Sequence, residues 1–226
     1  MKQKAVYDKA RKLIDERELD EENLDWAEDA LAKLLAKEPE CAWAYGLVSE
    51  IYYWRGEIAP AGEKLALFQD GVDFGEQGIA LDENCLEANF WLAVNYGFFG
   101  QEKGIMQSLS LINPMRQCLE RARTLDESYF YGGPCRALGR LYHQAPGWPI
   151  SVGNTGKAIE FLQTALKHGP RFYLNHIYIA EAYLSGAKKE QAREHLQWVI
   201  DAPPSPRHER EDEVYKQEAK RLLKKL

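Results

Sequence analysis

Two arginines and a histidine recur at helical spacing near the middle of the chain. Arg136, Arg140 and His143 stand at positions i, i+4 and i+7, so in a helix they would share one face. Two guanidinium groups on one face form a fork that can bind a carboxylate or a phosphate. The alternative is a structural role, in which the arginines pair with an acidic side chain such as Glu50 or Glu181. Both roles stay open from the sequence.

The same region ends on GNTGK (residues 153–157), which at first sight looks like a phosphate-binding loop. A Walker A loop needs a glycine five residues before its second glycine, and a Ser or Thr directly after the lysine. Here Ser151 occupies the first position and Ala158 the second. We therefore expect no nucleotide site, and we expect Asn154 or Thr155 to cap a helix that begins near residue 157.

Catalysis would require a nucleophile or base coupled to a second group, and the sequence offers no such set. Cys135 and His143 would lie on one helix, but eight residues of helix separate them by ~12 Å, too far for a dyad. The other histidines are scattered, at His168, His176, His195 and His208. The cysteines form no CxxC pair and stand at Cys41, Cys85, Cys118 and Cys135. We expect a non-catalytic protein with no metal or cofactor, and free buried cysteines.

The composition narrows the class of protein further. Of 226 residues, 45% are hydrophobic and 28% are charged, with a net charge of −6 and both signs mixed along the chain. A nucleic-acid-binding protein normally has a basic balance, so we expect none here. No run of about 18 apolar residues predicts a membrane span. The first residues have no apolar signal segment, which favours the cytoplasm for the chain as given, or a trimmed form of an exported protein.

The elements that must position these residues repeat along the chain. An apolar residue, a small residue and a tyrosine three positions later recur on four predicted helices, with the tyrosines at Tyr52, Tyr96, Tyr142 and Tyr183. The three positions form one helical stripe, on which the small residue admits a neighbouring backbone and the tyrosine fills the adjacent space. A second apolar helix and a short break follow each time. The breaks fall at Pro39, Glu83, Glu127, Pro170 and Pro203.

This repeat predicts an all-α fold, a right-handed stack of about five helical hairpins in one domain, residues 1–226. A helical hairpin cannot bury its apolar face alone, and stacking buries it. The expected hairpins cover about residues 2–39, 40–83, 84–127, 128–170 and 171–204. A capping helix is expected at 207–226, sealing the last hairpin with Val214, Leu222 and Leu226.

In such a stack, one face of each hairpin's first helix lines an inner groove. Aromatic side chains on that face, with the basic face described above, suit an amphiphilic acid or a partner's peptide. Trp148 lies in a Pro-Gly-Trp-Pro break between two helices, where it either packs back on the stack or rims the mouth of the site. The predicted binding residues are Arg136, Arg140, His143, Trp43, Glu50, Tyr53, Trp54, Phe90, Phe98 and Trp148.

Apolar-small-x-x-Tyr, followed by Ala158-x-x-x-Leu162-x-x-Ala165 and Pro170, resembles the tetratricopeptide repeat (TPR). The resemblance covers nearly the whole chain and is cleanest over residues 132–170 and 173–204. The TPR period of about 34 residues is lengthened by apparent insertions at 58–71, 101–114 and 145–154.

A narrower resemblance rests on residues 100–106, GQEKGIM, and on residues 132–147, which begin Gly-Gly-Pro and end Ala-Pro-Gly. Both segments are similar to the TatT family, the T-component of TRAP transporters. The resemblance implies a TPR-like periplasmic lipoprotein that associates with the transporter's solute-binding protein and holds an apolar or carboxylate ligand. The alternative is a cytosolic TPR adaptor that binds a peptide or helix of a partner protein. The oligomeric state stays open.

Overall fold

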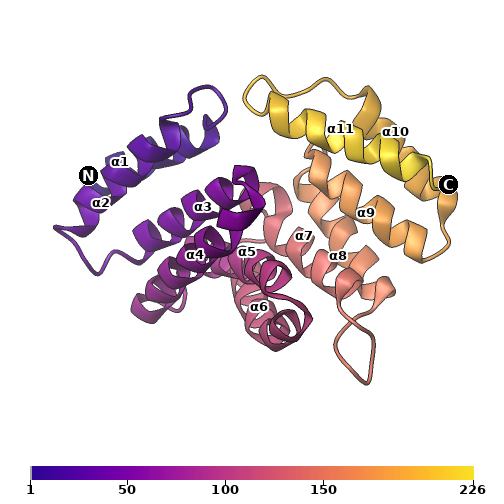
Figure 1. The fold of residues 1–226 in the computed structure, drawn as a ribbon, viewed down its shortest axis with the longest axis horizontal. Helices are drawn as coiled ribbons and strands as arrows, with labels where there is room; N and C mark the ends of the chain where they lie inside the picture. Colours follow the sequence, from indigo (N-terminus) through magenta and orange to yellow (C-terminus); the bar gives the residue numbers. More distant parts are fainter. Residues whose placement is uncertain (1) are drawn as a thin grey trace. The chain divides into compact units, whose positions relative to one another are not determined.

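The computed structural model describes residues 2–226, and the all-α class predicted from the sequence is confirmed. These residues form eleven helices and no strand (Figure 1). The first six helices are α1 (Lys2–Asp15), α2 (Asn23–Leu35), α3 (Ala42–Ile58), α4 (Ala61–Leu81), α5 (Leu86–Lys103) and α6 (Ile105–Leu125). The others are α7 (Tyr129–Gln144), α8 (Thr155–His168), α9 (Tyr173–Ser185), α10 (Lys189–Asp201) and α11 (Glu209–Leu223).

The chain divides into two compact units, which we call unit 1 (Met1–Leu125) and unit 2 (Asp126–Leu226). Unit 1 holds α1 to α6 and unit 2 holds α7 to α11. Within each unit, consecutive helices pack in antiparallel pairs, and α11 lies against α9 and α10 (Figure 1). The single domain expected from the repeat stays a prediction.

The small residues of the repeat lie where helices approach most closely. Ser49, Ala93 and Ala180 are completely buried. A Cβ placed on Gly139 would lie 2.5 Å from Cγ of Leu162, closer than two carbon atoms can come without contact strain. Close packing against the neighbouring helix α8 is therefore the physical reason for a small residue at this position of the stripe.

Two of the three apparent insertions are additional helical turns. Residues 58–71 and 101–114 extend the second helices of their hairpins, so α4 and α6 are each 21 residues long. Pro60 separates α3 from α4, whereas Pro114 lies inside α6. The third apparent insertion, 145–154, is an irregular loop between α7 and α8. At its end the Asn154 side chain accepts a hydrogen bond from the Lys157 N–H, as the predicted helix cap requires.

The capping helix α11 buries only part of the face that the sequence predicted. Leu222 is buried, but Val214 is 60% exposed, so its predicted sealing role is wrong. The buried face instead carries Asp212, whose carboxylate accepts a hydrogen bond from the Ser205 N–H at 2.6 Å. Around the helix axis, the buried residues Asp212, Ala219 and Leu222 fall within an arc of about 80°, and Val214 lies about 80° beyond Leu222, outside this arc.

All four cysteines are free and buried, at Cys41, Cys85, Cys118 and Cys135. Burial raises the pKa of Cys85 to about 12 and that of Cys118 to about 11, which keeps both thiols protonated and unreactive at neutral pH. Among the described residues, no helix combines the length and the apolar character that crossing a bilayer requires.

Candidate functional site

The residues that the sequence singled out for binding fall in both units. Unit 1 holds Trp43, Glu50, Tyr53, Trp54, Phe90 and Phe98. Unit 2 holds Arg136, Arg140, His143 and Trp148. The arrangement inside each unit shows what these side chains contact.

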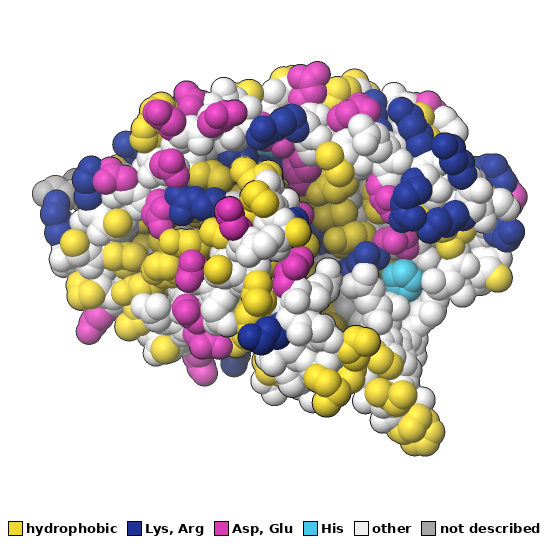
Figure 2. Space-filling model, in the orientation of Figure 1, with side chains coloured by type: hydrophobic (Ala, Val, Ile, Leu, Met, Phe, Trp, Pro, Cys, Tyr) yellow, Lys and Arg dark blue, Asp and Glu magenta, His cyan; other side chains and the backbone are white. Residues whose placement is uncertain are grey.

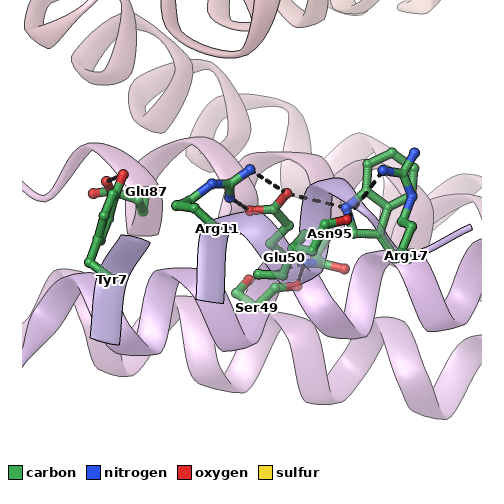
Figure 3. A network of polar contacts seen from close by, with 9 residues as sticks. Tyr7, Arg11, Arg17, Ser49, Glu50, Glu87 and Asn95 are labelled. Atoms are coloured by element: carbon green, nitrogen blue, oxygen red, sulfur yellow. Dashed lines mark hydrogen bonds and ion pairs between the residues drawn. The ribbon is translucent and has the colours of Figure 1, made fainter. Parts of the chain in front are cut away.

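In unit 1, the carboxylate of Glu50 is completely buried at the centre of a polar network (Figure 3). Arg11 of α1 donates to both carboxylate oxygens, with a distance of 3.2 Å from Nη2 to Oε1. The Trp54 indole N–H donates to the same Oε1 at 3.2 Å. A buried carboxylate is tolerated only with such partners, so these contacts give Glu50 a structural role.

Helix α1 supplies further side chains to this network that the sequence analysis missed. Tyr7 donates to Glu87 of α5 at 2.8 Å and packs edge-on against Trp43, with ring centroids 5.2 Å apart. Burial, followed by the nearby Glu87 charge, raises the pKa of Tyr7. Tyr7 and Arg11 are spaced i, i+4, the same signal that drew attention to α7, and they could have been found by it (Figure 3).

A second set of contacts ties α3, α4 and α5 together beside Glu50 (Figure 3). The Asn95 side-chain amide donates to the Ser49 carbonyl at 2.9 Å, and the Ser49 hydroxyl donates to the Gly71 carbonyl at 2.6 Å. Asn95 and Ser49 are both completely buried. The network is therefore part of the interior of unit 1.

The aromatic residues predicted to take up an apolar ligand form a cluster in unit 1. Tyr53 lies 4.6 Å from Trp54, 5.2 Å from Phe98 and 5.4 Å from Trp91, measured between ring centroids. Phe90 packs edge-on against Trp91 at 4.8 Å. Only Phe98 is half-buried, and the other four rings are buried. Their packing with one another is a stabilising core, and their role toward a ligand stays a prediction.

In unit 2, Arg136 holds a strained turn at the start of α7. Phe130, Tyr131 and Gly132 all adopt left-handed backbone conformations, with φ of 46°, 60° and 77°. The buried Arg136 guanidinium donates to the Phe130 carbonyl and to the Asn175 side-chain oxygen, each at 3.2 Å. Regular helix thus begins at Gly133, within the Gly-Gly-Pro segment. These contacts assign Arg136 to the turn.

Arg140 and His143 continue the same face of α7, and this face lies along α9. Arg140 pairs with Glu181, and its guanidinium carbon lies 4.3 Å from the centre of the Tyr178 ring. His143 Nε2 lies 2.8 Å from the Ser185 hydroxyl. The predicted pairing of an arginine with Glu181 is therefore observed, and Glu50 pairs with Arg11 instead. The Arg140 and Glu181 side chains keep 24% and 20% of their surface exposed.

Among the described residues, the His143 ring forms a hydrogen bond through Nε2 but not through Nδ1. Its Nδ1 atom is buried and has no hydrogen-bond partner among residues 2–226. Burial, followed by the neighbouring Arg140 charge, lowers the pKa of His143, so the ring is neutral at physiological pH. Together, Arg140, Glu181 and His143 could bind a polar group with either an acidic oxygen or a hydrogen-bond donor.

Trp148 is 89% exposed at the end of the loop between α7 and α8. The interpretation in which it packs back on the helices is therefore wrong. The short Pro-Gly-Trp-Pro segment places the ring beyond the reach of the neighbouring helices.

Unit 2 also contains a histidine pair that the sequence analysis did not identify. Nδ1 of His176 on α9 lies 3.0 Å from Nδ1 of His195 on α10, and Nε2 of His176 lies 3.0 Å from the Pro170 carbonyl. The Trp198 ring stacks on His176 at 3.8 Å. Burial lowers the pKa of His176 to about 4 and also lowers that of His195. The signal in the sequence was a histidine within the apolar helix 173–185.

This pair predicts that acid weakens the fold. In the unfolded chain each histidine binds a proton near pH 6.5, but folded His176 binds one only near pH 4. The unfolded state therefore gains protons first, and stability falls as the pH drops from about 6.5 toward 4. We expect the midpoint of urea unfolding to decrease between pH 7 and pH 5, with a smaller decrease in His176→Phe. Equal decreases in wild type and His176→Phe would mean that the histidine pair does not cause the sensitivity to acid.

Among residues 2–226, no cluster of three or more His, Cys, Asp or Glu side chains is arranged to hold a metal ion. The polar groups described above instead form pairs and hydrogen bonds between helices.

The family model described as the TRAP transporter T-component, TAtT, matches residues 78–226. The chain belongs to this family. The match contains both segments on which the resemblance rested, 100–106 and 132–147, and it includes all of unit 2. No curated protein matches this T-component.

Solved structures similar to this T-component are TPR proteins. A thermophilic TPR protein of Thermus thermophilus, TTC0263, has a TM-score of 0.68 at 16% identity, over 95% of this chain and 98% of that one. Two structures of MamA have TM-scores of 0.52 and 0.51 at 18% and 19% identity. They cover 91% and 90% of this chain, and 91% and 97% of their own. At these identities the likeness concerns the fold, and it confirms the predicted TPR-like helical repeat.

Proposed function

We propose that this T-component is a non-catalytic accessory protein of a TRAP-type transporter. It docks the transporter's solute-binding protein and holds a small anionic or amphiphilic ligand. The observation that carries the proposal is the family match over residues 78–226. The TPR-like helical repeat supports it, because such folds present helix faces to partner proteins.

The polar part of the proposed site is the set Arg140, Glu181 and His143 on the facing sides of α7 and α9. Arg140 is already paired, so a bound carboxylate would join or replace Glu181 at the guanidinium. The free Nδ1 of His143 would accept a hydrogen bond from a hydroxyl or amide of the ligand or partner. Arg136 would stabilise this face indirectly, because its hydrogen bonds fix the backbone at the start of α7.

A pull-down from the source organism tests the proposal, with the bound proteins identified by mass spectrometry. Wild type should retain a solute-binding protein, and Arg140→Glu should lose most of it. Loss of one charge-assisted hydrogen bond weakens binding by about 1.5–3 kcal/mol, roughly tenfold or more. Arg193→Glu is the matched control, because Arg193 is an exposed arginine of α10 that also pairs with a glutamate.

Two further results would decide the interpretation. Capture of a cytosolic protein in place of a solute-binding protein would make the chain a TPR adaptor. Equal capture by wild type and Arg140→Glu would remove Arg140 from the docking surface. The double variant Arg140→Glu/Glu181→Arg keeps the ion pair but exchanges the positions of its two charges. If this variant loses capture while its thermal stability is unchanged, the loss is due to docking and not to unfolding.

A further inference from the structure

Five helix ends gather at one end of unit 2, which we call the loop end. Helices α7, α9 and α11 finish there, and α8 and α10 begin there (Figure 1). His143 contacts Ser185 across α7 and α9. A Cβ on Gly186 would lie 3.7 Å from the Thr155 methyl group, and Lys189 Nζ lies 3.2 Å from the Leu226 carbonyl. The 145–154 loop, the α9–α10 turn and the C-terminus therefore share this end.

The 145–154 loop is held in a defined shape and presents apolar side chains to solvent. The Gly153 N–H donates to the Pro146 carbonyl at 2.9 Å, and the Asn154 N–H donates to the carbonyl of Tyr142 at 2.8 Å. Its end carries Trp148 and Ile150, which are 89% and 72% exposed. Figure 1 shows the loop projecting beyond α7 and α8, and Figure 2 shows hydrophobic side chains at its end.

Exposed lysines lie at the same end of unit 2 as this apolar loop. No charged residue occurs between residues 144 and 156. The exposed basic residues at these helix ends are Lys157, Lys188, Lys189, Lys224 and Lys225, together with Arg221, which pairs with Glu218. The exposed Glu190 of the α10 start is paired with Arg193, at 3.7 Å. The loop end thus combines a convex apolar projection with a surplus of exposed positive charge, although the whole chain is acidic.

We propose that the loop end of unit 2 binds the surface of an anionic phospholipid bilayer, with Trp148 and Ile150 inserted among the headgroups. Tryptophan is enriched at membrane interfaces and at protein–protein interfaces, so Trp148 alone does not distinguish a bilayer from a protein partner. The lysines favour a bilayer, because lysine is depleted from protein–protein interfaces, whereas lysines near a bilayer are attracted to anionic lipids. The inference stands independently of the proposed function.

Vesicle co-sedimentation of the full chain tests this proposal. The probes are phosphatidylcholine vesicles with and without about one third phosphatidylglycerol, at low and at physiological salt. Wild type should bind the anionic vesicles more tightly, and the binding should weaken with salt. Each lysine at the surface contributes about fivefold to the affinity, so Lys224→Glu/Lys225→Glu should bind at least about 25-fold more weakly. Trp148→Ala should bind about tenfold more weakly, because it loses the inserted ring.

Matched variants in unit 1 control for charge and for exposed tryptophan. Lys4→Glu/Lys9→Glu makes the same charge change at exposed lysines, and Trp26→Ala removes another exposed indole. Both should bind vesicles as wild type does. Failure of wild type to prefer anionic vesicles, or equal binding by Trp148→Ala and wild type, would overturn the proposal. Capture of a protein partner that requires Trp148, without vesicle binding, would assign the loop to a protein pocket instead.

Discussion

Replacement of Arg11 by alanine is expected to lower the free energy of unfolding by about 3–5 kcal/mol, since it leaves a buried carboxylate without its cation. Glu50 is completely buried and Arg11 donates to both of its oxygens, so no solvent can replace the lost charge. Trp54 would remain as a donor to Glu50, but one neutral N–H cannot compensate a full negative charge. Urea unfolding followed by tryptophan fluorescence measures the change, because Trp54 lies within the affected network.

Two variants distinguish the contribution of the Arg11–Glu50 ion pair to stability from the general effect of removing a cation from α1. Lys12→Ala removes a cation from the same helix, where Lys12 is 4.0 Å from Glu16 and mostly exposed, and it should change the free energy by about 0.5 kcal/mol or less. Arg11→Met/Glu50→Gln removes both charges and should recover most of the stability. Equal stability of Arg11→Ala and Lys12→Ala would mean that Glu50 does not depend on Arg11.

The helical repeat could be predicted because its signals are local. An apolar residue, a small residue and a tyrosine within one helical turn mark each first helix, and a Pro or Asp-Glu break marks each end. Helix length was harder to predict. Residues 58–71 and 101–114 departed from the TPR period and were interpreted as insertions, although each simply continues the second helix of its hairpin.

The face formed by Arg136, Arg140 and His143 was predictable, but its partners were not. Helical spacing places the three side chains together on α7, whereas their contacts depend on the register of α9 against α7. That register brings Asn175, Glu181 and Ser185 opposite them in the same order. The register is set by packing between helices some forty residues apart, for which the sequence contains no local signal.

Arg11 and Tyr7 were missed for a related reason. Helix α1 lacks the apolar-small-x-x-Tyr pattern, so no repeat position indicated which of its residues point inward. A buried acidic residue within an apolar helix was nevertheless a usable signal, since Glu50 had to find a cation. The left-handed turn at residues 130–132 had no such signal beyond its glycine, because Phe and Tyr seldom adopt positive φ.

The repeat tyrosines are expected to differ in their contribution to stability, although the sequence treats them as equivalent. Tyr96, Tyr142 and Tyr183 are 7–9% exposed, whereas Tyr52 is only half-buried. Replacing any of the first three with alanine should cost about 3–5 kcal/mol, since each leaves a cavity of aromatic size. Tyr52→Ala should cost less, about 1–2 kcal/mol, because part of its ring already contacts water.

Conservative substitutions show which interaction carries the effect. Tyr142 stacks on Phe161 with ring centroids 5.6 Å apart, so Tyr142→Phe should stay within about 0.5 kcal/mol of wild type. Tyr96 donates to Glu76 at 2.7 Å, and Tyr96→Phe should lose about 1 kcal/mol. Urea unfolding of the alanine and phenylalanine variants measures both quantities. If Tyr52→Ala were as destabilising as Tyr142→Ala, position in the repeat would govern stability, and burial of the individual ring would not.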